Sequence, residues 1–355
     1  ADGLALAIVE ATAVPDTATG RRGIEVEGRV PLRARVRGVV PAAEAEVRVA
    51  GRPARVRALT ADEQARYALA GPGVLFEGEA PLAAGQDTVR VQARSGRALG
   101  QALVRPVVGD RWAVVIGISR FADPAVPALR HAAADARAVH DFLRSEAGGA
   151  LPPERIRLLV DEQATTAAIR DALFVFLQQA REGDQVTVYV ASHGAPDPAR
   201  PANLYILSHD TDAKRVASTA FPMWDFQTAL RRQIAAERVV VIADACHSAG
   251  TLVSDPTPIN DALGALFNPS MRMTLTAARG DEFSREDERW GGGHGVFTWT
   301  LLEGLRGAAD ADGDRVVTFT EVARYVEARV PAETNGEQNP QRAGLGDVPM
   351  AIVRR

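Results

Sequence analysis

The sequence of 355 residues holds very little of two residue types, and each shortage limits the chemistry that the chain can carry out. There is one cysteine, Cys246, so no disulfide can form within the chain and only one thiol is available as a nucleophile. Lysine is equally scarce, because Lys214 stands alone among 41 basic residues and the rest are arginine. We attribute the excess of arginine to genomic composition and not to function.

Long apolar runs are missing as well, and no stretch approaches the roughly 20 apolar residues of a membrane-spanning helix. The net charge of −4, without an evidently basic face, argues against binding to nucleic acid. The hydrophobic content of 46% is enough for a sizeable core, and the length is typical of about two domains. The localisation stays open, because one cysteine fits any redox compartment and a sequence that begins with Ala1 is silent on signal peptides.

Residues 1–105 have the pattern of an all-β domain. Apolar and polar residues alternate in the stretches 23–30, 46–49 and 87–93, which indicates strands with one buried face. Glycine and proline interrupt these stretches at the spacing of a small sandwich. In composition the region resembles an immunoglobulin-like module. We interpret residues 106–111 as the linker that follows it.

Residues 112–355 have a different pattern, in which strands and helices alternate. Continuous apolar runs, typical of strands buried on both faces, are separated by stretches of helical spacing. This order predicts an α/β domain with a mainly parallel sheet and helices on both faces. Ligands of such sheets bind beyond the carboxyl ends of the strands. The predicted strands are 112–118, 156–160, 185–190 and 238–243, and the predicted helices are 131–145, 165–181 and 224–235.

Two of these strands end in residues that can carry out chemistry. The third strand runs into His193 and Gly194, and the fourth runs into Asp244 and Cys246. If the two strands are parallel neighbours, the histidine and the cysteine emerge at the same edge of the sheet. A thiol needs a base, because the thiolate is the attacking species and free cysteine has a pKa of about 8.5. The backbone N–H groups of Gly194 and Cys246 are the candidates for stabilising an oxyanion, since we expect both to lie in turns.

Each of these two residues has a simpler interpretation when it is taken alone. A lone cysteine at a strand end is usually a small buried apolar residue, and a lone His-Gly pair is usually part of a turn. Together they favour catalysis, because His193 lies 53 residues before Cys246, close to the spacing of about 50 in caspases.

The order of elements and the motifs at the strand ends resemble the caspase and metacaspase superfamily over residues 111–332. In metacaspases an aspartate lies two positions before the nucleophile, as Asp244 does here, whereas caspases have glutamine. The resemblance implies a cysteine endopeptidase in which Cys246 is the nucleophile, His193 the general base and a thioacyl-enzyme the intermediate. It also implies that polypeptides are the substrates.

A second carboxylate, Asp135, lies in a stretch similar to the metacaspase segment that ends Asn-Asp-Ala, with Ala134 in place of the asparagine. In that family this aspartate joins the one near the nucleophile, here Asp244, in binding a basic side chain. Two carboxylates suit a guanidinium group. The resemblance therefore predicts cleavage after Arg, and also Lys, and not after Asp. The alternative for Asp135 is a solvated helix residue.

Two later segments are assigned to the surroundings of the active site. By resemblance to the family, Asp281 and Ser284 line the substrate groove. The glycine run 291–293 lacks the Lys-Ser/Thr of a phosphate-binding loop. We expect it to form a loop near the active site, ahead of a core helix that opens at Val296 and Phe297.

Residues 310–321 resemble the calcium-binding loop of an EF-hand, which supplies oxygen ligands at fixed positions. The departure is Arg315, where that family has glycine, and a non-glycine residue in the required conformation costs on the order of 1 kcal/mol. The alternative is an acidic turn that caps the next helix. The chemistry itself requires no cofactor, so we expect any bound Ca2+ to be structural. The predicted ligands are Asp310, Asp312, Asp314, Val316 through its carbonyl, Thr318 and Glu321.

An Arg-specific peptidase can cut copies of itself, so basic residues mark the candidate activation sites. Residues 239–271, which include the loop after the nucleophile, hold neither arginine nor lysine. We therefore expect a zymogen to be processed near the linker, at Arg105, Arg111 or Arg120, by itself or by another protease. Two other functions stay open: an interaction protein that uses the peptidase fold as a scaffold, and a hydrolase of non-peptide acyl groups.

Overall fold

The chain forms two units, Ala1–Gly109 and Asp110–Arg355, each with a hydrophobic core of its own. The computed structural model describes residues 4–15, 32–67, 69–82, 88–104, 107–181, 183–197, 200–236, 238–246, 272–279, 282–313, 315–344 and 348–353.

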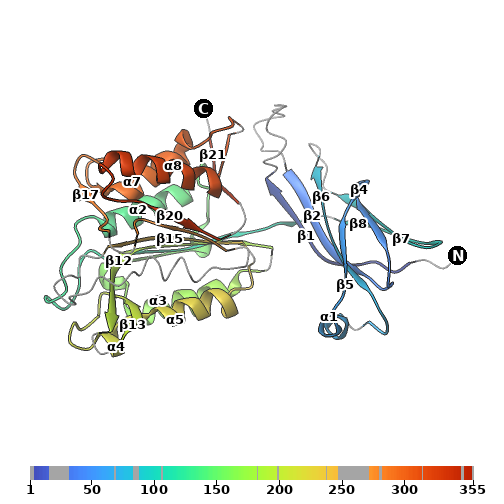
Figure 1. The fold of residues 1–355 in the computed structure, drawn as a ribbon, viewed down its shortest axis with the longest axis horizontal. Helices are drawn as coiled ribbons and strands as arrows, with labels where there is room; N and C mark the ends of the chain where they lie inside the picture. The colour runs from blue at the N-terminus through green and yellow to red at the C-terminus, as the bar shows by residue number, and fades with distance from the viewer. Residues whose placement is uncertain are drawn as a thin grey trace. The chain divides into compact units, whose positions relative to one another are not determined.

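The first unit consists of two sheets around a small apolar core (Figure 1). The alternation expected of half-buried strands is present in β7, where Val89, Val91 and Ala93 are buried and the residues between them are exposed. The prediction of an all-β first domain is confirmed, while its likeness to an immunoglobulin module stays a prediction. One sheet has the order β5-β6-β2-β1-β9 and the other β4-β3-β7-β8. The elements are β1 (Ala7–Pro15), β2 (Leu32–Val40), β3 (Glu46–Val49), β4 (Arg52–Pro53), β5 (Arg55–Ala58), the short helix α1 (Ala61–Arg66), β6 (Val74–Leu82), β7 (Val89–Ser95), β8 (Ala98–Val104) and β9 (Val107–Val108).

The second unit is built on a sheet with the order β11-β10-β12-β15-β16-β20, in which the first five strands are parallel and the edge strand β20 is antiparallel, and β13 and β14 extend it by antiparallel pairing at the end of β12. The strands are β10 (Arg111–Gly117), β11 (Ile156–Val160), β12 (Gln185–Asp197), β13 (Arg200–Ile206), β14 (Phe221–Pro222), β15 (Arg238–Cys246), β16 (Arg272–Thr276), β17 (Glu286–Asp287), β18 (His294–Gly295), β19 (Val316–Thr318), β20 (Gln341–Ala343) and β21 (Pro349–Ile352). The helices are α2 (Ala132–Arg144), α3 (Thr166–Asp171), α4 (Val216–Thr219), α5 (Met223–Thr228), α7 (Val296–Glu303) and α8 (Phe319–Glu333), with further helical turns at Pro153–Arg155, Asp161–Gln163, Ala172–Gln179, Ala229–Gln233 and Gly304–Ala308.

Helices cover both faces of this sheet, with α2, α7 and α8 on one face and α3 and α5 on the other (Figure 1). The central strands are apolar throughout because alternate residues pack into opposite layers. In β10, Val115 belongs to the core under α2, and Val114 belongs to the core under α3. The predicted α/β fold with a mainly parallel sheet is confirmed. Among the helices that the structure describes, none has the length and apolar character needed to cross a membrane.

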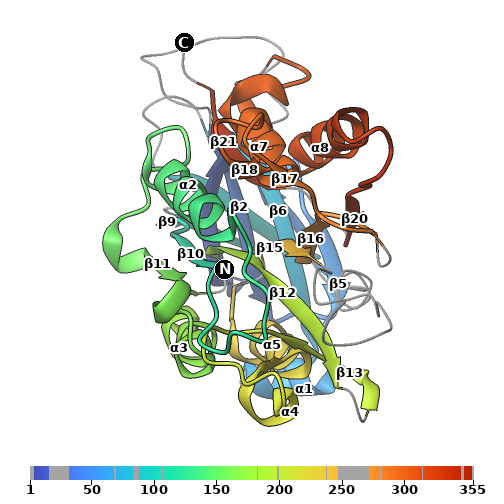
Figure 2. The ribbon, with the colours of Figure 1, turned by 90° about the vertical axis from the view of Figure 1, so that its left-hand side faces the viewer.

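The register of β12 and β15 aligns the two chemically important strand ends. The strands pair in parallel over nine positions, from Gln185 opposite Arg238 to His193 opposite Cys246. Their carboxyl ends therefore reach the same edge of the sheet. Figure 2 looks at this edge, with β12 and β15 between the two helix layers. The two strands lie in the middle of the sheet, with β10 beside β12 and β16 beside β15.

The strand β12 is longer than its apolar run predicted. It continues through His193 and Gly194 to Asp197, and there pairs antiparallel with β13. The expectation that Gly194 and Cys246 lie in turns was wrong, because Gly194 is inside β12 and Cys246 is the last residue of β15. The sequence signal stopped at residue 190 because polar and small residues follow, but all of them are buried in the structure.

Candidate active site

The His193 ring is held from two directions in a buried position. Its Nε2 lies 2.8 Å from the carbonyl oxygen of Pro127. A carbonyl only accepts, so Nε2 carries the hydrogen, and Nδ1 is then the basic nitrogen of the neutral ring. The ring of Phe121 stacks on the imidazole, with 5.3 Å between ring centroids and 20° between planes. No motif or periodicity in the sequence predicted that Phe121 and Pro127 contact His193.

The loop that carries Phe121 and Pro127 is fixed at its start. The Oδ1 of the buried Asp161 accepts the backbone N–H groups of Ser119 and Arg120 at 2.8 and 3.0 Å. At its other end, the N–H of Leu129 donates to the carbonyl of Ser119 at 2.9 Å. The contacts of the His193 ring therefore come from a rigid support, as the orientation of a general base requires.

The amide of Gly194 is directed toward the side of β12 on which β15 lies. The carbonyl of His193 accepts from the N–H of Leu207 at 2.9 Å, on the side of β12 that faces β10 and β13. In a trans peptide the C=O and the next N–H point in opposite directions. The Gly194 N–H therefore points to the side where Cys246 ends β15.

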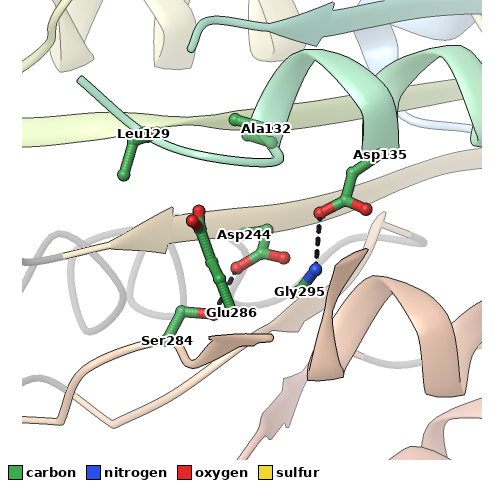
Figure 3. Close-up of a pocket in the computed structure, with 8 residues that line it drawn as sticks. Leu129, Ala132, Asp135, Asp244, Ser284, Glu286 and Gly295 are labelled. Carbon is green, nitrogen blue, oxygen red and sulfur yellow. Dashed lines mark hydrogen bonds between the residues drawn. The ribbon is translucent and has the colours of Figure 1, made fainter. Parts of the chain in front are cut away.

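A pocket of about 220 Å³ lies beside the ends of β12 and β15, and Figure 3 shows the residues around it. It brings together three carboxylates from α2, β15 and β17, with apolar side chains opposite them. Ala191 of β12 is part of the wall. The lining residues are Leu129, Ala132, Asp135, Ala191, Asp244, Ser284, Glu286 and Gly295.

Asp244 forms the buried floor of this pocket. Its Oδ1 accepts from Ser284 Oγ at 2.7 Å, and its Oδ2 accepts from Thr298 Oγ1 at 3.0 Å. Burial, together with the nearby charge of Asp135, raises the pKa of Asp244 to about 7, against the effect of the two hydroxyl groups. This carboxyl group is therefore close to its titration midpoint near neutral pH.

Asp135 is buried as well, only 2% exposed, so the alternative of a solvated helix residue is wrong. Its Oδ2 accepts the backbone N–H of Gly295 at 3.0 Å, and its Oδ1 lies 2.5 Å from Nδ1 of His294. Burial raises the pKa of Asp135, and the contacts with His294 and Gly295 oppose this rise.

Gly295 leaves space between the two aspartates. A Cβ at this position would lie 3.1 Å from Asp135 Oδ2 and 3.2 Å from Asp244 Oδ2. The two oxygens therefore flank one space that a side chain at residue 295 would enter. Glycine keeps that space available for a ligand group.

Glu286 is a third carboxylate of the pocket that the sequence analysis missed. Its Oε2 accepts the backbone N–H of Arg130 at 2.9 Å, and burial raises its pKa. Ser284 and Glu286 are less exposed than Phe283, Arg285 and Asp287 between and beside them, so this extended segment turns alternate residues toward the pocket. Asp281, predicted to line the groove, lies outside the described residues.

The acidic loop before α8 brings three of its predicted calcium ligands together. Oxygen atoms of Asp310, Asp312 and Glu321 lie within 4.8 Å of one another. Asp310 accepts the backbone N–H of Gly313 at 2.9 Å and that of Arg315 at 3.1 Å. Asp314 lies outside the described residues. This set of carboxylate oxygens fits the preference of Ca2+ for hard oxygen ligands.

The same loop also caps the helix that follows it. Thr318 is the N-cap of α8, its side chain accepts from the Glu321 N–H, and Glu321 accepts in turn from the Thr318 N–H. Val316 and Thr318, the other predicted ligands, lie in β19, which pairs with β21. Arg315 has a φ of 68°, in the left-handed region where the EF-hand loop has glycine.

Comparison with known proteins identifies the family of the second unit. The family described as caspase domain matches residues 110–344. A comparison with curated proteins gave no significant match. Among solved structures, protein GSU0716 from Geobacter sulfurreducens is 16% identical, with a TM-score of 0.49 over 69% of this chain and 100% of that one. The structure titled pro-sf-caspase-1 is 14% identical, with a TM-score of 0.42 over 66% of this chain and 91% of the other.

Because the family matches well over half of the residues, the chain belongs to the caspase-domain peptidases. It is a cysteine-type peptidase, and therefore a hydrolase.

Proposed function

We propose that this peptidase is an endopeptidase that cleaves polypeptides on the carboxyl side of Arg, and also of Lys, through Cys246 and His193. The observation that carries the proposal is the pocket next to the strand ends of the two residues, in which two carboxylates are buried and a third is half-buried. A basic side chain is the ligand that compensates acids withdrawn from water in this way.

In this mechanism His193 takes the proton of the Cys246 thiol, and the thiolate attacks the carbonyl carbon of the substrate. The negative oxygen of the tetrahedral intermediate is stabilised by the N–H groups of Gly194 and Cys246. The C–N bond then breaks as the His193 imidazolium gives its proton to the leaving amine. A water molecule, deprotonated by His193, attacks the thioacyl-enzyme and releases the carboxylic acid and the thiol.

The positions of the carboxylates favour arginine over lysine. Asp135 and Asp244 present one oxygen each to the space beside Gly295. A guanidinium group has several N–H donors in one plane and can contact both oxygens at once, whereas an ammonium group is a point charge. A cation in this space also stabilises the ionised forms of both acids, whose pKa values burial has raised.

The test is cleavage of fluorogenic peptides with Arg, Lys, Leu or Asp before the scissile bond. Cys246→Ala and His193→Ala should each lower kcat/KM by at least about 1,000-fold. The matched control is His140→Ala, because His140 lies on α2 and is not among the residues that line the pocket or hold His193. Preference for Asp over Arg would contradict the basic pocket. Turnover of simple esters with no peptide cleavage would favour the hydrolase of acyl groups.

We further propose that any activating cleavage falls at Arg105. Arg111 begins β10, and its guanidinium is tied to the carbonyls of Gly148 and Met350, so a protease cannot reach it in the folded chain. Arg120 is exposed, but it lies in the loop that carries Phe121 and Pro127. Cutting there would release the support of His193. Mass spectrometry of protein activated by itself or by trypsin, with Arg105→Ala as the comparison, shows which bond is cut on activation. Activation that accompanies a cut after Arg120 would contradict it.

A structural Ca2+ in the loop of Asp310, Asp312 and Glu321 is a separate proposal, supported by the distances among their oxygen atoms. The ion would hold the loop ahead of α8 and take no part in the chemistry.

The alternative to a peptidase is an interaction protein that uses the fold as a scaffold. A protein that neither cleaves peptides nor binds them after trypsin treatment would favour this alternative.

A further inference from the structure

The glycine run ahead of α7 forms a tight turn. Gly291, Gly292 and Gly293 have φ values of 62°, 86° and 126°, all in the region that side chains disfavour. Gly293 also packs on the ring of His131, since a Cβ there would lie 3.0 Å from its Cε1. The turn ends at His294, the first residue of β18. Three consecutive glycines therefore allow the chain to place His294 close to α2.

His294 contacts the pocket acid that faces it on α2. Its Nδ1 lies 2.5 Å from Asp135 Oδ1, and the side chains are 21% and 3% exposed. An ionised carboxylate only accepts, so Nδ1 carries the hydrogen of this bond. The other oxygen, Oδ2, accepts from the Gly295 N–H and is the one that faces Asp244 (Figure 3). The two contacts therefore fix the rotation of the carboxylate.

The surroundings of Asp135 otherwise work against its charge. It is buried, and the acids Asp244 and Glu286 line the same pocket. Opposing these are the donor groups of His294 and Gly295 and the nearby ring of His131. The charged or titratable groups around His294 come from several segments: Asp135 of α2 and His131 just before this helix, Glu286 and Asp287 of β17, Asp244 of β15 and Glu288 of the turn.

We propose that His294 is a positioning residue for substrate selection, which keeps Asp135 charged with its Oδ2 toward Asp244, so that the pocket binds a guanidinium between the two. The inference rests on the proposed preference for basic residues. His294 itself does not contact the reacting atoms and acts only through Asp135.

The first test measures binding of a peptide that ends in Arg to the intact Cys246→Ala protein by calorimetry at pH 7.5. Adding His294→Leu should weaken the affinity by roughly tenfold or more, the value of a lost charge-assisted hydrogen bond. His294→Asn should stay within about threefold of the parent, because an amide N–H can take the place of Nδ1–H. The matched control is His140→Leu, because Nδ1 of His140 also contacts an aspartate on α2, Asp141, at 2.9 Å.

The active enzyme provides a readout that a general loss of structure would not produce. His294→Leu should raise KM for Arg peptides, leave kcat unchanged, and move the acidic limb of kcat/KM to higher pH, because Asp135 is protonated more easily. His294→Asn should restore KM. An unchanged KM and pH profile in His294→Leu would overturn the role of His294.

A measurement without a change at residue 294 covers the case in which His294→Leu does not fold. In Cys246→Ala protein, the NMR signals of the His294 imidazole should move when the Arg peptide binds, because its partner Asp135 contacts the ligand, while those of His140 should stay in place. His294 signals that the peptide leaves unchanged would overturn the inference alone. Absence of peptide binding to the Cys246→Ala protein would contradict the basic pocket itself, and this inference with it.

Discussion

Two groups of acidic residues in the second unit differ in how the chain assembles them. Asp310, Asp312 and Glu321 lie within twelve residues of sequence, and their spacing alone indicates a common loop. Asp135, Asp244 and Glu286 come from α2, β15 and β17, and only the topology of the sheet brings them together. The first group is partly or fully exposed, whereas the aspartates of the second are buried.

The difference shows how burial changes the chemistry of the same functional group. Burial raises the pKa of all three pocket acids, and that of Asp244 to about 7. Charges attract more strongly away from water, because the effective dielectric constant is lower and salt screens them less. The pocket should therefore respond to a cation of the substrate, and the loop to a divalent ion from solution.

The largest expected effect separates the two groups by substrate preference. Asp135→Asn and Asp244→Asn should each lower kcat/KM for Arg peptides by two to three orders of magnitude, since each leaves a buried charge pair incomplete. The matched control on the same helix is Asp141→Asn, whose side chain is exposed. Asp312→Asn should keep the ratio of Arg to Leu cleavage. Equal losses for Arg and Leu peptides in the pocket variants would contradict the distinction.

The next effect is on stability and concerns Asp244 alone. Because the pKa of Asp244 is raised, the stability that its carboxyl group contributes is fully present below about pH 3.8, the pKa of this group in the unfolded chain. That stability is lost as the pH rises through about 7. Asp244→Asn removes this loss. The free energy of unfolding of the variant, relative to the wild type, should therefore rise by a few kcal/mol between pH 4 and 7 and stay at that level above pH 7.

Tryptophan fluorescence measures this gain in the relevant unit, because Trp112, Trp224, Trp290 and Trp299 all lie in the second unit. Asp141→Asn should follow the wild type at every pH. A constant difference between Asp244→Asn and wild type across this range would show that the pKa of Asp244 is not raised.

The sequence predicted the elements that have a strong local pattern. The apolar strands, the helices between them and the position of His193 and Cys246 at the ends of two neighbouring strands follow from periodicity and strand order. Glu286 and His294 did not follow, because they lie on strands of two residues that have no periodic pattern of their own. Their roles depend on contacts with Arg130 and with Asp135 of α2, more than 150 positions away in the sequence.

A smaller effect concerns the acidic loop. Calcium at a hundredfold excess over its Kd should stabilise the second unit by about 2.7 kcal/mol, and raise Tm by several degrees. Asp312→Asn should reduce this shift, and Glu321→Gln should remove it while keeping the cap of α8, because the amide oxygen of glutamine can still accept the Thr318 N–H. The measurement is thermal unfolding with Ca2+, with Mg2+ and with chelator. Equal Tm values in all three would leave the loop as a helix cap only.

The smallest expected effect is at Arg315, which has a φ of 68°. Arg315→Gly should stabilise the second unit by less than about 1 kcal/mol, because relief of the left-handed conformation is partly offset by the entropy of glycine. Arg315→Ala is the control, since it removes the side chain and keeps the conformation. Equal stability of the two variants would show that the backbone at residue 315 is not strained.

The pairing of His193 and Cys246 at the end of nine aligned positions has a consequence for evolution and for engineering. His193 belongs to the buried middle of the sheet, whereas Glu286 and His294 lie on the hairpin of β17 and β18 and Ser284 lies just before it. If the proposed function holds, substitutions at these three residues change which residue is recognised without moving β12 and β15. A library restricted to Ser284, Glu286 and His294, which spares the buried Trp290 and the glycine turn, should therefore yield peptidases of new specificity that keep the stability of the parent.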